Sequence, residues 1–104
     1  MEKVIRDGKV AVLISHGYGA GWSTWNPSNA EIFMFHPKLV KLVEEGRQSE
    51  ITDAYCEEVL GITGIYTGGA NDLVIKWLPV GTVFRIDEYD GSESLVTENV
   101  YYTA

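Results

Sequence analysis

The sequence predicts an α+β fold: an antiparallel sheet of about five or six strands with an inserted two-helix hairpin. In its first half an apolar run, Val10 to Ile14, leads into a glycine-rich loop and then into apolar residues at helical spacing. From Ile62 onward, apolar residues recur at every second position between short turn motifs, which is typical of hairpin strands. With 104 residues and no linker or repeat, we expect a single domain over residues 1–104.

The first hairpin is predicted by the dipeptide Asp7-Gly8, which suits the two positive φ angles of a type I′ turn. It separates two expected strands, at 3–6 and 9–15. The second of these is almost entirely apolar, so we expect a central strand that is covered on both faces. The residues that follow, 16–30, contain three glycines and Pro27, and we expect no helix there.

Two helices are expected between residues 36 and 61. The short aromatic segment 31–35 precedes them, and we expect it to be extended and packed on the core. Pro37 suits the first position of the first helix, which Gly46 ends. Ser49 is the expected N-cap of the second helix, which Gly61 ends. The expected buried face of the second helix consists of Ile51, Ala54, Tyr55 and Val59, with Cys56 at its border as a structural thiol.

The rest of the chain predicts hairpin strands, because turn motifs separate segments that have a period of two. The expected turns are Gly68 to Asn71, Pro79 to Gly81 and Asp90-Gly91. The expected strands cover residues 62–67, 72–78, 82–88 and 92–97, with 100–102 as an additional edge strand.

The composition argues against several classes of protein. A net charge of −7, from 8 basic and 15 acidic residues, disfavours direct binding to nucleic acid, which requires a clustered basic surface. The longest apolar run is far shorter than the ~20 residues that cross a bilayer, so we expect no membrane association. The N-terminus mixes charges of both signs without an apolar signal core, and the chain has one cysteine. Both features predict a cytoplasmic location.

The most distinctive segment is the Gly/Trp loop, defined here as residues 16–26. Its glycines would let the backbone approach a ligand closely, and its tryptophan rings would stack on that ligand. Alternatively, the glycines only permit a tight loop and the rings fill the end of the core. Arg85 lies within an expected strand and is an anion anchor if it faces the loop. The candidate ligand-binding residues are His16, Gly17, Tyr18, Gly19, Gly21, Trp22, Thr24, Trp25, Asn26 and Arg85.

The sequence contains no recognisable catalytic constellation. Ser15-His16-Gly17 after an apolar strand is similar to the oxyanion-loop segment of α/β-hydrolases, but no Gly-x-Ser-x-Gly motif and no histidine after His36 complete that pattern. The alternate spacing of the loop glycines also differs from that of a dinucleotide-binding loop. Two histidines and one cysteine, far apart in the chain, lack metal-ligand spacing. We therefore expect no enzyme activity, no cofactor and no metal.

Three segments carry a resemblance that extends over most of the chain: Lys9 to Leu13, Gly17 to Asn26 and Trp77 to Gly91. They resemble small proteins of bacteriophages and prophages that have no assigned activity. The resemblance implies a compact accessory protein in the cytoplasm of a bacterial host, where such proteins often counter host defence and some sequester nucleotide signals. The first functional hypothesis is therefore a non-catalytic homo-oligomer that binds a small polar ligand, such as a nucleotide, at the Gly/Trp loop.

A second hypothesis rests on the acidic charge. In this hypothesis the chain is an interaction protein that docks on a basic, nucleic-acid-binding host protein and inhibits it. The candidate partner-binding residues are Glu50, Asp53 and Glu57 on the second expected helix, together with Asp87, Glu88 and Asp90.

Overall fold

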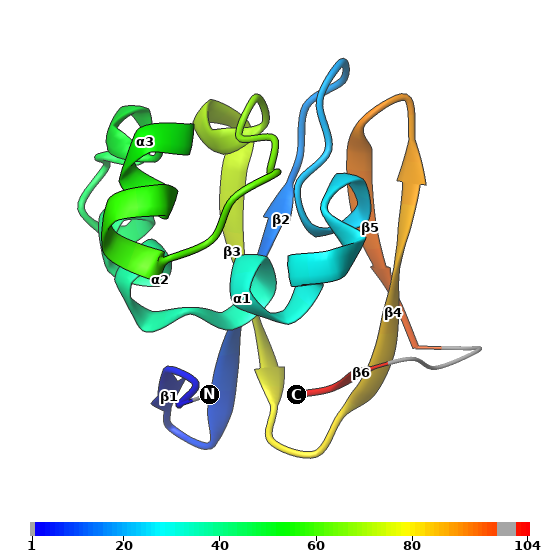
Figure 1. The fold of residues 1–104 in the computed structure, drawn as a ribbon. Coiled ribbons are helices and arrows are strands. Elements are labelled where there is room, and N and C mark those ends of the chain that lie inside the picture. Colours follow the sequence, from blue (N-terminus) through cyan, green and yellow to red (C-terminus); the bar gives the residue numbers. More distant parts are fainter. Residues whose placement is uncertain (1, 98–101) are drawn as a thin grey trace.

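The computed structural model describes residues 2–97 and 102–104, and its α+β class confirms the sequence prediction. Its strands form two three-stranded antiparallel sheets, ordered β1-β2-β3 and β5-β4-β6, in place of the single larger sheet that we expected. In Figure 1, α2 and α3 lie on the β3 side of the molecule and β4 lies on the opposite side. The strands are β1 (Ile5–Arg6), β2 (Lys9–Ser15), β3 (Leu73–Pro79), β4 (Val83–Tyr89), β5 (Ser92–Val96) and β6 (Tyr102–Thr103).

Strand β2 lies at the centre of the core. It pairs with β3 over its whole length and is buried from Val10 onward. Ala11 and Leu13 join one apolar cluster with the helical layer, while Val10 and Val12 join a second cluster that includes Phe84 of β4. The prediction of a central strand covered on both faces is therefore confirmed.

A glutamate side chain connects the two sheets at the end of β2. At the end of β2 the backbone N–H of Ser15 donates to Oε1 of Glu93 on β5 at 2.9 Å, so a carboxylate stands where a ladder partner would be. After β3 the chain turns away from the first sheet, and the N–H of Val80 donates to the carbonyl of Gly8 at 2.9 Å. Strands β3 and β4 consequently belong to different sheets and do not form the hairpin that we expected.

The aromatic segment after the Gly/Trp loop is a helix, α1 (Ala30–Phe35), and the prediction of an extended segment is wrong. Two short 3-10 helical turns, Ser23–Trp25 and Pro27–Asn29, precede it, so the prediction that residues 16–30 contain no helix is also wrong. Its aromatic residues face two different clusters: Phe33 packs on Trp22 with ring centroids 4.4 Å apart, and Phe35 meets Phe84 edge-on at 6.3 Å. Successive helical side chains diverge by about 100°, which allows neighbouring residues to reach both clusters at once.

The first predicted helix is confirmed as α2 (Pro37–Glu44), with proline in its first turn. Gly46, with φ of 69°, follows its end and takes the left-handed conformation that often follows a helix.

The second predicted helix differs from our expectation. It begins after Thr52, not at Ser49, because the Thr52 hydroxyl accepts the N–H of Tyr55 at 3.1 Å and caps α3 (Asp53–Tyr55). A π-helical turn, Cys56–Leu60, continues it and widens the spacing of its side chains. As a result Ala54 and Val59, which we expected to be buried, are exposed.

The segment 62–67 is irregular, so the predicted first hairpin of the second half is absent from the described residues. Gly61 and Gly64 have φ of 68°, which interrupts an extended conformation, and β3 pairs with β2 instead. The turns Asp7-Gly8 and Asp90-Gly91 have the positive φ angles that we expected. Residues 100 and 101 of the expected edge strand lie outside the described residues; Tyr102 belongs to β6. No helix within the described ranges is long and apolar enough to span a membrane.

Candidate functional site

The backbone N–H groups of the Gly/Trp loop bind a carboxylate of the chain itself. Oε2 of Glu93 accepts the N–H groups of Trp22 at 2.9 Å and Thr24 at 3.0 Å, as well as the hydroxyl of Thr24 at 2.5 Å. Oε1 accepts the N–H of Ser15. Only 2% of Glu93 is exposed, so this carboxylate is buried and satisfied by four donors. Two backbone N–H groups of the loop thus bind an anion that belongs to the chain itself.

Trp22 lies in the core. Its side chain is fully buried, packs on Phe33, and donates its indole N–H to the Phe33 carbonyl at 2.8 Å. This indole therefore fills the end of the apolar cluster beside β2, and a ligand at the surface would not reach its face.

The loop glycines provide close approaches within the chain. A Cβ on Gly17 would lie 2.6 Å from the Asp72 carboxylate, and a Cβ on Gly21 would lie 2.6 Å from the Trp25 ring. Gly19 has φ of 96° and donates its N–H to the Asp90 carbonyl at 2.6 Å. Each of these glycines thus accommodates a neighbouring group of the fold.

A stacked aromatic pair remains at the surface. The rings of Trp25 and Tyr66 lie 5.7 Å apart and nearly parallel, and these residues are 38% and 47% exposed. Asn26 fixes their relative position: its side chain donates to the carbonyls of Trp22 (2.7 Å) and Tyr66 (2.9 Å) and accepts the N–H of Tyr66 at 2.7 Å. The composition of the segment 62–67 gave no reason to include Tyr66 in the site.

The remaining candidate residues lie apart from this pair. Tyr18 is exposed at the tip of the loop, and His16 lines a cavity described below. Arg85 forms an ion pair with Asp87 of the same strand. It lines neither of the two cavities described below.

The acidic candidates Glu50, Asp53 and Glu57, of which only Asp53 lies on α3, differ in their partners. Glu50 receives a two-point ion pair from Arg47, which lowers the pKa of the Glu50 carboxyl through hydrogen bonding. The Asp53 carboxylate accepts a hydrogen bond from the Thr67 hydroxyl at 2.7 Å, and Thr67 directly follows Tyr66 in the chain. Glu57 has no hydrogen-bond or ion-pair partner among the described residues, so its charge faces solvent.

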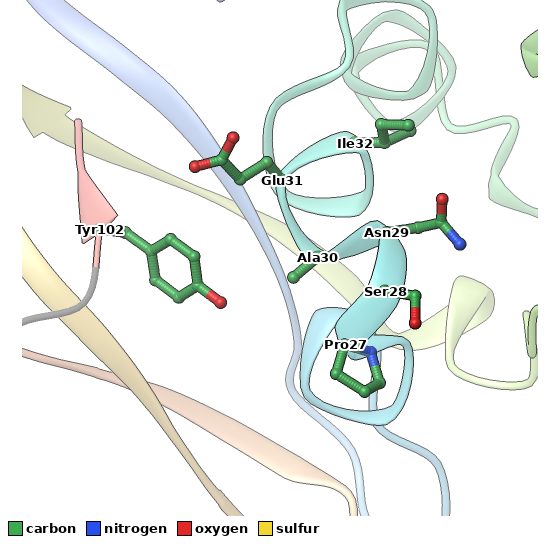
Figure 2. Close-up of a pocket in the computed structure, with 7 residues that line it drawn as sticks. All are labelled: Pro27, Ser28, Asn29, Ala30, Glu31, Ile32 and Tyr102. Atoms are coloured by element: carbon green, nitrogen blue, oxygen red, sulfur yellow. The ribbon is translucent and has the colours of Figure 1, made fainter.

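The described residues form one surface cavity beside α1 and another beside β2. The first, of about 360 Å³, lies between β6 and the start of α1 (Figure 2). Figure 2 shows the Tyr102 ring facing Ala30, while Asn29 and Ile32 project from the other side of the helical turn. The second cavity, of about 450 Å³, lies where the end of β2, the middle of β3 and β5 meet. It includes His16 and the side chain of Lys76.

The described residues contain no group of three or more histidine, cysteine or acidic side chains that could hold a metal ion. Burial, reinforced by the charge of Asp53, raises the pKa of the Cys56 thiol to about 11, which disfavours a thiolate nucleophile. No family model, curated protein or solved structure matches the chain.

Proposed function

We propose that this chain is a non-catalytic interaction protein that docks on a basic protein partner. The docking surface, called here the aromatic–acidic surface, consists of Trp25, Tyr66, Asp53 and Glu57. The observation that carries the proposal is the exposed Trp25–Tyr66 stack, held in place from beneath by the buried Asn26 amide.

The aromatic pair has the properties of an interface anchor. Tryptophan and tyrosine are enriched among the residues that contribute most to binding between proteins. The two rings are already stacked, and Asn26 ties both segments of chain together, so little conformational entropy is lost when a partner covers them. Gly21 and Gly68 allow this arrangement, because a Cβ on either would collide with the Trp25 or the Tyr66 ring.

The charge beside the pair indicates the chemistry of the partner. Asp53 is bonded to Thr67, the residue next to Tyr66, and Glu57 follows four positions later on the same helical segment. With a net charge of −7, the chain attracts a basic surface over a distance of about one Debye length, which accelerates association. Lysine or arginine side chains of a partner would pair with the carboxylates and stack on the exposed rings.

The alternative of a small ligand held by the Gly/Trp loop is less favoured. The N–H groups of Trp22 and Thr24 are engaged by Glu93, and the Asn26 amide is engaged by the backbone of Trp22 and Tyr66. A ligand at this position would have to displace a buried carboxylate that has four donors.

The test uses immobilised protein to capture partners from an extract of bacterial cells, followed by kinetic measurement with each purified candidate. Trp25→Ala should raise the dissociation rate at least about tenfold, because it removes an anchor. Glu57→Lys should lower the association rate and reduce its dependence on salt. We choose Glu57 in preference to Glu50, because Glu50 is already neutralised by Arg47.

Two exposed residues elsewhere provide matched controls. Tyr89→Ala removes an aromatic ring at the end of β4, and Glu31→Lys reverses a charge on α1; both should bind the partner like the wild type. The proposal fails if every captured protein binds Trp25→Ala as tightly as the wild type. It also fails if Tyr89→Ala weakens binding by the same factor.

A further inference from the structure

The cavity of about 450 Å³ brings together polar groups from three strands. Register explains part of its composition: Lys76 on β3 stands opposite Val12, so its side chain shares a face of the sheet with Ile14, two residues further along β2. His16 follows the end of β2, and residues of β5 form another wall of the cavity. The lining residues are Ile14, His16, Lys76, Ser92, Ser94 and Leu95, together with Glu93.

Lys76, which supplies the positive charge in this cavity, forms no ion pair with the described residues. All three arginines form ion pairs with acidic residues, whereas Lys76 has no such partner among the described residues. The acidic residue in the lining is Glu93, whose oxygens accept the backbone N–H groups of Ser15, Trp22 and Thr24. The Lys76 ammonium is therefore left to the cavity and to solvent.

The other groups complete a polar site with an apolar floor. The Ser92 hydroxyl bonds to the His16 carbonyl at 3.2 Å, which connects the β5 wall to the loop that carries the imidazole. The Ser94 hydroxyl has no recorded partner among the described residues and supplies a further donor. Ile14 and Leu95 supply apolar surface, and a volume of this size is within the range of small-molecule sites.

We infer that this cavity binds a small phosphate ester. An ammonium, an imidazole and the Ser94 hydroxyl are donors that suit the oxygens of a phosphate monoester, and the apolar wall suits the organic body of the ester. The site is separate from the aromatic–acidic surface and shares only His16 with the candidate ligand residues of the sequence. Side chains would hold the ligand in this site, so the N–H groups of the Gly/Trp loop would stay hydrogen-bonded to Glu93.

The test is a two-dimensional NMR titration with adenosine monophosphate as the probe. We expect saturable shifts of the amide signals of His16 and residues 92–95. Adenosine, which lacks the phosphate, should give no such shifts. Lys76→Gln should raise the Kd at least about tenfold, since it removes the charge and keeps most of the side chain. Ser94→Asp should abolish binding, because it places a negative charge beside the phosphate.

Lys9→Gln is the matched control, because Lys9 is an exposed lysine at the other end of the β2–β3 pair. It should bind adenosine monophosphate with the Kd of the wild type. The same spectra show whether each variant is folded. The inference is overturned if the signals of residues 92–95 do not shift, if adenosine shifts them equally, or if folded Lys76→Gln binds as tightly as the wild type.

Discussion

The carboxylate of Glu93 accepts a hydrogen bond from the backbone N–H of Trp22 at 2.9 Å, although 71 positions separate the two residues in the chain. The same carboxylate binds Ser15, the last residue of β2, and Thr24, which lies in the short 3-10 helical turn Ser23–Trp25. One side chain thus joins β5 of the second sheet to β2 of the first and holds the Gly/Trp loop between them. Because the donors are backbone groups, the conformation of the loop depends on a charge that lies outside it.

Glu93→Gln should destabilise the fold strongly. The amide keeps the shape of the carboxylate but turns an NH₂ group toward N–H donors, so that at least one buried donor loses its acceptor. We expect the free energy of unfolding to fall by about 3 kcal/mol, as measured by urea denaturation. Glu88→Gln is the control in the same hairpin, since Glu88 accepts only the N–H of Gly91 and is exposed. A loss below about 1 kcal/mol for both variants would contradict the role of Glu93.

The two tryptophans of the loop should respond differently to truncation. Trp22→Ala removes a fully buried indole and leaves the Phe33 carbonyl without its donor, so we expect a loss of about 4 kcal/mol or an unfolded chain. Trp25→Ala removes a half-exposed ring and should cost about 1 kcal/mol. Circular dichroism and urea denaturation of both variants make the comparison. Equal losses would show that Trp25 supports the fold as much as Trp22 does.

The sequence correctly predicted the elements whose structure depends on residues close together in the chain. The apolar run of β2 can only be buried on both faces, the Asp7-Gly8 pair suits one kind of turn, and Pro37 with Gly46 bounds a helix. For α1 the same reasoning failed, because five residues are too few to separate a helical period from an extended one. The helix forms there because it lets Phe33 pack on Trp22 in one apolar cluster while Phe35 packs on Phe84 in the other.

The candidate site depended on contacts that no local pattern contains. Glu93 alternates with serines in Ser92-Glu93-Ser94, which is the pattern of a solvated strand face, yet its partners lie 69 to 78 positions away. Tyr66 likewise joins the site through Asn26, 40 positions earlier. The glycine spacing correctly indicated close approaches, but the approaching groups, such as the Asp72 carboxylate, come from distant segments of the same chain.

His36 should make the stability depend on mildly acidic pH. Its Nδ1 accepts the N–H of Lys38 at 3.1 Å and caps α2, which requires the neutral imidazole. Burial, together with the charge of Lys38, lowers the pKa of His36 below 6.5. The unfolded chain therefore takes up the proton first, so this contribution is complete above pH 6.5 and is lost as the pH falls through the lowered pKa.

Urea denaturation of the wild type and of His36→Asn on either side of this range tests the prediction. Asparagine retains an acceptor at the N-cap and does not titrate. The stability of the wild type should fall more on acidification than that of His36→Asn. Parallel curves for the two proteins would show that the cap tolerates the proton.

Cys56 should make the stability fall at alkaline pH and should resist thiol reagents in the native state. Burial raises the pKa of its thiol from 9.0 to about 11, so above pH 9 the unfolded chain releases the proton more readily than the folded chain does. This contribution is complete below pH 9 and is lost as the pH rises toward about 11. Cys56→Ala should show a smaller decrease of the free energy of unfolding over the same range, which separates the thiol from the tyrosines and lysines that also titrate there.

At neutral pH a maleimide should modify Cys56 of the wild type only as fast as the surrounding structure opens, and that rate should rise with added urea. Rapid modification without urea would mean that Cys56 reaches solvent through the π-helical turn, and the raised pKa would then have no structural cause.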